Sequence, residues 1–306
     1  MLPSVPELPD ITLYIERLSA RFAGEPLEGV RLSSPFLVRT AVPPLASVFG
    51  RPVREFSRIG KRIVFHFDEE LFLVLHLMIA GRLRLRDKGI AVPKKNGLAV
   101  FDFPAESVLL TEASSKKRAS LHVVQGHDAL AQIDPGGIDV IGSRLEDFVD
   151  ALTRENHTIK RSLTDPRVLS GIGNAYSDEI LHDARMSPIR MTQKMTREEF
   201  ARLHASVQRV MTSWIDRFRA ELGPDGFPEQ VTAFREGMAV HGKYGQPCPV
   251  CGAKVQRIAY ADNETNYCAN CQNGGKLLAD RSLSRLLRDD WPRTLAELEE
   301  RTAQRK

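Results

Sequence analysis

Four cysteines near the carboxyl end of the chain have the types and spacing that indicate chemistry most clearly. They form two Cys-x2-Cys pairs, Cys248 with Cys251 and Cys268 with Cys271, and the sequence contains no further cysteine. Two thiolates on one tight turn can face the same metal ion, and a second such turn completes a tetrahedral shell of sulfur ligands. The spacing therefore predicts one structural Zn²⁺ ion with no open coordination position.

The cysteines alone leave the partner of this expected zinc finger undecided. Four unrelated buried thiols are the alternative to a metal site, but they would not need paired spacing. Residues 254–267, between the pairs, are expected to form a hairpin that is too small to fold without the metal. Zinc-bound hairpins serve nucleic acids or partner proteins, so a DNA-binding module and a protein-interaction module both fit the spacing.

A glycine-rich turn at residues 171–173 is a second candidate binding element. Gly171 and Gly173 flank Ile172, and Asn174 follows at the expected start of a helix. Glycines let backbone amides approach an anion closely at a helix N-terminus, and the Asn174 side chain can donate to the same phosphate. A plain turn between packed helices is the alternative interpretation of these residues.

Composition indicates a globular protein of more than one domain. The chain has 306 residues, of which 42% are hydrophobic and 27% charged, enough for a sizeable core. The net charge of +4 favours a polyanionic partner only mildly. No apolar run approaches the roughly 20 residues that span a bilayer, and no signal-peptide pattern opens the chain. We therefore expect a cytoplasmic protein with no membrane partner.

Hydrophobic periodicity predicts the elements that position these residues. Residues 9–23 have helical spacing, with Asp10 placed to begin the helix, and residues 30–124 have the strand-like pattern of a β-sandwich or barrel. Turn residues at 134–139 mark a domain boundary, and residues 144–222 are expected to be mainly helical. Capping boxes are predicted at residues 143–146 and 196–199.

Several segments together resemble the formamidopyrimidine-DNA glycosylase and endonuclease VIII family over residues 6 to about 275. They are the zinc finger, Pro6-Glu-Leu-Pro-Asp10, Gly60-Lys61 with His76-Leu77, and residues 159–180, which are similar to the family's helix-two-turns-helix element. The resemblance implies an α+β fold with an N-terminal helix and a β-sandwich. The expected domains are a β-sandwich domain at 1–135, a helical DNA-binding domain at 136–240, the zinc finger at 241–275 and a helical extension at 276–306.

The resemblance also implies a base-excision-repair enzyme, a DNA glycosylase with AP lyase activity on oxidised bases in double-stranded DNA. In the family an N-terminal proline amine attacks C1′ of the sugar, expels the damaged base and forms a Schiff base that permits strand cleavage. Pro6 matches this nucleophile, and Glu7 matches the residue that transfers the proton. An α-amine with a pKa of roughly 7.7–8.0 is partly neutral at pH 7, so it is a ready nucleophile.

Further positions carry over from the family one residue at a time. Lys61 matches a lysine that contacts phosphate, and Ile79 stands where an apolar side chain is wedged into the gap left by the flipped base. Asn263 occupies the place of the family's arginine on the zinc hairpin. The other expected DNA contacts are His76, Lys160 and Asn174, and the supporting residues are Asp10 and Glu179.

The sequence departs from the family pattern at the expected nucleophile. Pro6 follows Val5, so its nitrogen is a tertiary amide without a basic lone pair. Proteolytic trimming would expose the amine, and so would translation that starts at Val5 followed by removal of the initiator methionine. Two alternatives need neither event: a catalytically impaired protein that binds damaged DNA, and an AP lyase that uses Lys61.

Other departures concern the opposite strand and the tail. Residues 111–118 replace the family's loop that probes the opposite strand, so the preferred lesion and opposite base are not assigned. The basic run at 116–118 within it fits either phosphate contacts or a solvated face. A basic amphipathic helix over 281–288 and a capping box at 294–297 are predicted in the tail, which is expected to pack on the body of a monomer.

Overall fold

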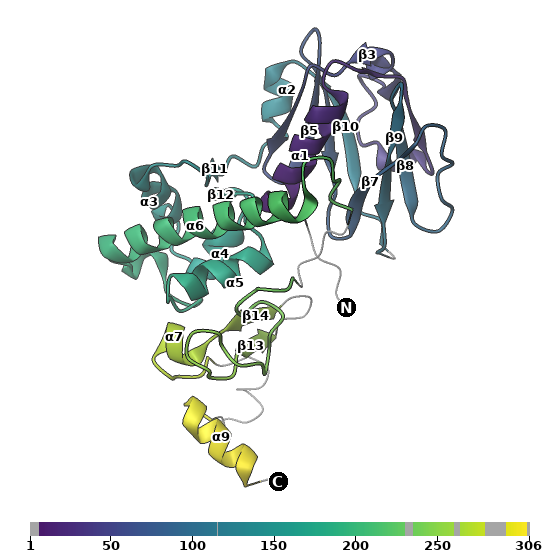
Figure 1. Ribbon diagram of the computed structural model, residues 1–306. Coiled ribbons are helices and arrows are strands. Elements are labelled where there is room, and N and C mark those ends of the chain that lie inside the picture. The colour runs from purple at the N-terminus through teal and green to yellow at the C-terminus, as the bar shows by residue number, and fades with distance from the viewer. Residues whose placement is uncertain (1–5, 115, 230–234, 260–263, 279–291, 305–306) are drawn as a thin grey trace. The chain divides into compact units, whose positions relative to one another are not determined.

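The computed structural model describes residues 6–114, 116–229, 235–259, 264–278 and 292–304 (Figure 1). The chain divides into two compact units, Met1–Gly137 with Met211–Ala233, and Ile138–Val210 with Phe234–Lys306. Among the described residues, no helix is both long enough and apolar enough to cross a bilayer.

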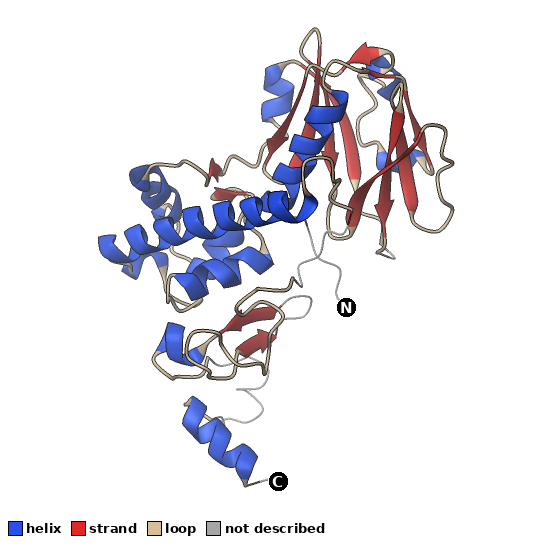
Figure 2. Cartoon of the chain, in the orientation of Figure 1, coloured by secondary structure: helices blue, strands red, loops and turns tan. Residues whose placement is uncertain are grey.

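The first unit is built on two four-stranded antiparallel sheets. One has the strand order β10-β6-β5-β4 and the other β2-β8-β9-β7, beside a short β1-β3 pair. The strands are β1 (Pro26–Leu27), β2 (Gly29–Leu32), β3 (Arg51–Pro52), β4 (Glu55–Ile59), β5 (Arg62–Phe67), β6 (Leu71–His76), β7 (Gly81–Asp87), β8 (Gly97–Asp102), β9 (Glu106–Glu112) and β10 (Ser120–Gln125). Figure 2 shows these strands in red.

One hydrophobic core joins the two sheets and the helix α1 (Leu8–Phe22). Phe65 and Leu73 of one sheet, Phe101 and Leu110 of the other, and Tyr14 of α1 are all buried in it. Alternate residues of a strand point to opposite faces, so the two inward faces share this core as in a sandwich. The other face of the β5-β6 sheet packs against α2 (His127–Ala131). The predicted β-sandwich with an N-terminal helix is therefore confirmed.

The second unit is mainly helical and ends in a zinc-finger hairpin. Its helices are α3 (Leu145–Thr153), α4 (Ile159–Thr164), α5 (Asn174–Asp183), α7 (Ala269–Asn273) and α9 (Leu295–Ala303). The long helix α6 (Arg197–Leu222) begins here and continues into the first unit. The strands of the second unit form two pairs. They are the parallel pair β11 (Ile138–Asp139) and β12 (Leu169–Ser170), and the antiparallel hairpin of β13 (Gln256–Ala259) and β14 (Glu264–Tyr267). The short 3-10 helices are η1 (Pro35–Leu37) and η2 (Leu45–Val48) in the first unit and η3 (Thr192–Lys194) in the second.

The predicted capping boxes have mixed outcomes. At the start of α6, Glu199 N donates to Thr196 Oγ1 at 3.3 Å and Thr196 N donates to the Glu199 carboxylate at 2.8 Å, which confirms that box. The box at 143–146 is wrong. Ser143 Oγ instead donates to Val140 O at 3.0 Å, because the chain turns there and the α3 N-cap falls one residue later.

The remaining sequence predictions about helix ends are also only partly right. Helix α1 begins at Leu8, and Asp10 lies in its first turn, where it accepts a hydrogen bond from Glu7 N at 2.9 Å. In the tail, Thr294 caps α9 as expected, but the Glu297 carboxylate accepts from Arg293 N. The helix predicted over 281–288 lies outside the described residues.

Candidate functional site

The first unit brings the start of α1 together with the turn between β4 and β5. Glu7 and Asp10 are 3% and 4% exposed, and their carboxylates act electrostatically on Lys61 in that turn. Burial lowers the pKa of Lys61 below its ordinary value, although the two carboxylates oppose the shift. Gly60, before it, has a φ of 60°, a conformation that glycine adopts without strain. The tight turn thus carries a buried amine close to two buried carboxylates.

His76 lies at the end of β6, next to further basic residues that the sequence did not single out. It is directly opposite Arg62 of β5 and Ser120 of β10, so these side chains share one face, and His122 lies two residues along on that face. Burial and the positive charges of Arg62, Lys61 and His122 lower the pKa of His76 to about 4. At pH 7 the His76 ring is therefore neutral and offers a hydrogen bond rather than a full charge.

The turn that carries Ile79 is tightly closed. Gly81 N donates to Leu77 O at 3.0 Å, and a Cβ on Gly81 would lie 2.1 Å from that oxygen, so only glycine fits. Met78 has a φ of 54°, and Ile79 is partly exposed between these residues. A hydrophobic side chain is thus held on a rigid turn, as the expected wedge requires.

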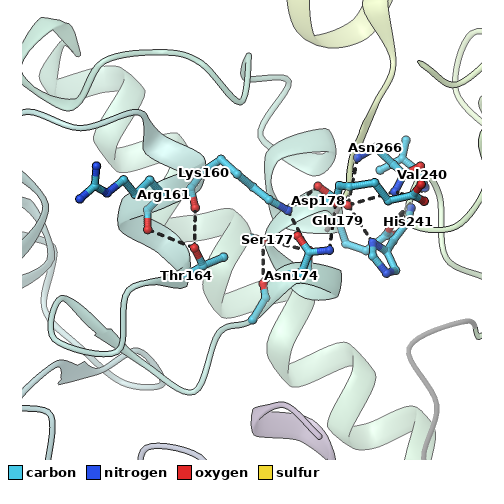
Figure 3. Close-up of polar contacts among 12 residues, drawn as sticks. Lys160, Arg161, Thr164, Asn174, Ser177, Asp178, Glu179, Val240, His241 and Asn266 are labelled. Atoms are coloured by element: carbon cyan, nitrogen blue, oxygen red, sulfur yellow. Dashed lines mark hydrogen bonds and ion pairs between the residues drawn. The ribbon is translucent and has the colours of Figure 1, made fainter. Parts of the chain in front are cut away.

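In the second unit, a network of charged groups surrounds α5 (Figure 3). The Asp178 carboxylate is almost completely buried, and it accepts hydrogen bonds from Lys160 Nζ at 2.5 Å, His241 Nδ1 at 2.7 Å and Asn266 N at 3.1 Å. Lys160 Nζ also donates to Asn174 O at 2.8 Å. Lys160, expected to contact phosphate, is therefore engaged inside the protein, where it joins α4 to α5.

Glu179, the next residue of α5, holds the chain that leads into the zinc finger. Its carboxylate accepts from the backbone N–H groups of Ala239, Val240 and His241 at 2.7, 2.9 and 2.8 Å. Burial raises the pKa of Glu179, while the three backbone donors oppose that shift. Glu179 thus fixes a backbone segment, which is a positioning role.

The glycine turn ends where α5 begins. Gly173 is the N-cap, and Asn174 is the first helical residue, as the sequence predicted. Asn174 Nδ2 donates to Glu264 O of the zinc hairpin at 2.9 Å. The expected phosphate-binding turn and the hairpin are therefore tied together by the same side chain. Asn263 lies outside the described residues.

The four cysteines converge as a metal site requires. Their sulfur atoms all lie within 4.8 Å of one another, with Cys248 Sγ 3.9 Å from Cys271 Sγ and Cys251 Sγ 3.4 Å from Cys268 Sγ. A tetrahedron with Zn–S bonds of about 2.3 Å has edges of about 3.8 Å, so the four thiols fit Zn²⁺. They come from two turns flanking the β13-β14 hairpin, and the predicted zinc site is confirmed.

Three family models match the chain. The formamidopyrimidine-DNA glycosylase N-terminal domain matches residues 5–123, the formamidopyrimidine-DNA glycosylase H2TH domain matches 142–221, and the zinc finger found in FPG and IleRS matches 245–274. A formamidopyrimidine-DNA glycosylase of Heliobacterium modesticaldum is 30% identical over 280 residues, which cover 88% of this chain and 100% of the relative. The chain belongs to the formamidopyrimidine-DNA glycosylase family.

Two further proteins match this chain, one over a shorter stretch and one at lower sequence identity. An uncharacterized formamidopyrimidine-DNA glycosylase-like protein of Mycobacterium tuberculosis is 40% identical over 152 residues, 50% of this chain and 94% of the relative. A solved structure of MutM in complex with DNA containing carbocyclic 8-oxo-G has a TM-score of 0.77 at 22% identity, and covers 88% of this chain and 100% of that one. This likeness shows a shared fold and confirms the expected α+β class.

Several residues that shape these sites were not singled out from the sequence. Arg62 and His122 become neighbours of His76 only through strand pairing, which single-sequence patterns do not reveal. Asp178 had a signal that could have been used, because it lies four residues after Asn174 and so shares its helical face. His182 continues the same spacing.

Proposed function

We propose that this protein is a base-excision-repair DNA glycosylase with AP lyase activity, acting on oxidised bases in double-stranded DNA. The observation that carries the proposal is the pair of buried carboxylates of Glu7 and Asp10, just after Pro6, which act on the desolvated amine of Lys61, in a chain of the formamidopyrimidine-DNA glycosylase family. Proton transfer and nucleophilic attack use acidic and basic groups that lie close together and whose pKa values are shifted by burial and by neighbouring charges. A cytoplasmic location suits four thiols that must stay reduced to bind zinc.

In the proposed reaction the Pro6 nitrogen forms a bond to C1′ of a flipped nucleotide. The bond between C1′ and the damaged base breaks, and the base leaves with the bonding electrons and takes up a proton. Glu7 takes the proton from the attacking nitrogen and delivers one to the sugar ring oxygen as the ring opens. The resulting Schiff base makes the protons on C2′ acidic, and loss of one of them to a base forms a C2′–C3′ double bond, expels the 3′ phosphate and cuts the strand.

Residues around Pro6 position the groups that take part in the proposed reaction. Asp10 accepts from Glu7 N at 2.9 Å and so fixes the backbone that carries the proton-transfer group. The chemistry requires a free Pro6 amine, because an amide nitrogen does not attack. Trimming after Val5, or initiation at Val5 with removal of the initiator methionine, would supply it. Lys61 supplies a positive charge beside Glu7 and a contact to phosphate.

DNA binding in this proposal draws on both units separately. Lys61, His76 and the Ile79 turn serve the first unit, whereas the Gly173-Asn174 start of α5 serves the second, where backbone amides favour an anion. Flipping a nucleotide costs a few kcal/mol, which an apolar wedge such as Ile79 helps to offset. Phosphate contacts should make affinity fall steeply with salt.

The lowered pKa of Lys61 favours a second candidate function. A lysine whose ammonium form is destabilised by burial is a better nucleophile at pH 7 than an exposed one. Lys61 could then attack an existing abasic sugar and cut the strand without base excision. This AP lyase needs no change at Val5.

Borohydride trapping separates these functions. Two versions of the chain, one complete and one beginning at Pro6, are incubated with duplexes containing 8-oxoguanine or an abasic site and then reduced. An adduct at Pro6 on both duplexes, formed only by the shortened chain, supports the glycosylase. An adduct at Lys61, on abasic DNA alone and lost in Lys61→Met, supports the lyase instead. No adduct in either version contradicts both, and retained affinity for the abasic duplex would identify a damaged-DNA binder.

A further inference from the structure

His182 lies on α5 beside a cysteine of the zinc site. Its Nε2 is 3.2 Å from Cys248 Sγ, and the two side chains are 6% and 2% exposed. A metal-bound thiolate has no proton and can only accept, so the proton of this contact must reside on His182 Nε2. The contact is therefore an N–H···S hydrogen bond from the helix to a zinc ligand.

The surroundings of Cys248 explain why such a donor matters. Cys248 packs in a small apolar cluster with Val240 and Val255, both fully buried. An anionic sulfur in an apolar environment is costly unless it is bonded to a metal and to hydrogen-bond donors. The imidazole N–H supplies such a donor from outside the cysteine turns.

Two other sulfurs, those of Cys251 and Cys268, accept hydrogen bonds from backbone N–H groups of their own turns. Cys251 is hydrogen-bonded by the backbone N–H of Ala253, and Cys268 Sγ accepts from Cys271 N at 3.5 Å. Cys248 differs because its donor comes from a residue 66 positions away in the chain. The zinc centre is thereby bonded directly to the helix that begins at the glycine turn.

His182 completes a row of contacts along one face of α5. Asn174, Asp178 and His182 are four residues apart, and each bonds to the zinc-finger segment, through Glu264, Asn266 and Cys248 respectively. Residues at this spacing lie above one another on a helix, so α5 presents a continuous polar face to the finger.

We propose that His182 is an outer-shell residue of the zinc centre, whose ring N–H donates to the Cys248 thiolate and slows loss of the metal. Its role is positioning, since it touches the ligand and not the ion. Removal of partners of this kind from metal ligands lowers metal affinity by roughly 10- to 100-fold. The inference concerns zinc retention and does not depend on catalytic activity.

Zinc release from the loaded full-length chain tests the inference. His182→Phe keeps an aromatic ring but removes the donor, whereas His182→Gln places an N–H near the position of Nε2. With a chelating dye in excess, we expect release to be about 10-fold faster in His182→Phe and within about 3-fold of the original in His182→Gln. His204→Phe is the matched control. It removes the hydrogen bond between the partly buried His204 Nε2 and Ser143 O, which involves none of the cysteines.

A spectroscopic readout distinguishes the hydrogen bond from general loosening. In the Co²⁺-loaded chain, loss of the N–H donor raises the energy of the sulfur lone pairs, so the sulfur-to-cobalt charge-transfer band should move to longer wavelength in His182→Phe but not in His182→Gln. If His182→Phe does not fold, His182→Asn, whose amide is too short to reach Cys248, takes its place. Unchanged release and an unshifted band in a folded donor-free variant would overturn the proposal.

Discussion

Buried carboxylates occur at the start of α1 and in the middle of α5, and their surroundings differ. Glu7 and Asp10 lie near Lys61, whose pKa burial lowers although both carboxylates oppose the shift. Asp178 and Glu179 each accept hydrogen bonds from three different residues at fixed positions. In the first arrangement two carboxylates of one helix start lie near a lysine amine, and in the second the carboxylates tie distant segments together.

This difference distinguishes carboxylates that are suited to proton transfer from carboxylates that hold segments of the chain in place. Groups whose charges compete in a buried place are suited to exchange protons during a reaction. Carboxylates with a full set of donors instead specify where a helix, a loop and a hairpin meet. In the function proposed above, the first unit therefore holds the groups for proton transfer, and the second unit anchors the zinc finger.

Removal of zinc should have the largest effect and should be confined to the second unit. Binding of structural Zn²⁺ contributes roughly 10–16 kcal/mol to small metal-dependent folds. Chelation, or Cys268→Ser, should abolish hydrogen-exchange protection at 256–259 and 264–267 while the β5 and β6 strands stay protected. Zinc added back should restore the chelated chain but not Cys268→Ser. Full protection of the hairpin without zinc would contradict the account.

Asp178→Asn should destabilise the second unit by about 3–5 kcal/mol, because it leaves the Lys160 ammonium buried without its counter-charge. The matched control is Asp183→Asn on the same helix, whose partly exposed pair with Arg209 should contribute about 0–1 kcal/mol. Urea unfolding monitored by far-ultraviolet circular dichroism gives both values. Equal losses in the two variants would show that Asp178 is not an anchor.

His76 should make the stability of the first unit depend on pH. Its folded pKa of about 4 lies below the ordinary histidine value of 6.5, so below pH 6.5 the unfolded chain binds a proton that the folded chain does not. The free energy of unfolding should therefore fall as pH drops from 6.5 towards 4, by about 1–2 kcal/mol at pH 5 from this group. His76→Gln should remove that component. Identical pH profiles for the two chains would contradict it.

Local spacing predicted the parts of the molecule that local chemistry controls. Cys248 and Cys251 share a turn, and Thr196 caps α6 with Glu199 three residues later, so both features can be recognised in the sequence. Ser143 carried the same capping signature and failed, because its hydroxyl is used by Val140 O. A local motif is thus reliable only where no other group, near or distant in the chain, competes for the same atoms.

The remaining site residues depend on contacts between distant segments. Lys160 was expected at a phosphate, but its ammonium is bound by Asp178, 18 residues later. His182 shares a helical face with Asn174 and Asp178, but its partner could not be predicted because that partner lies 66 residues away in another element. The catalytic and DNA-binding roles of Pro6, Glu7 and the other candidates stay predictions, since geometry alone does not test them.

Single-turnover excision from an 8-oxoguanine duplex, with the enzyme at saturating concentration, tests the division between the two units most directly. In a chain that begins at Pro6, Glu7→Gln should lower the saturated rate by at least about 100-fold with DNA affinity retained, because proton transfer contributes that much or more. Glu179→Gln should keep the saturated rate within a few-fold and weaken DNA binding instead. A normal rate in Glu7→Gln, or a rate loss confined to Glu179→Gln, would contradict the account.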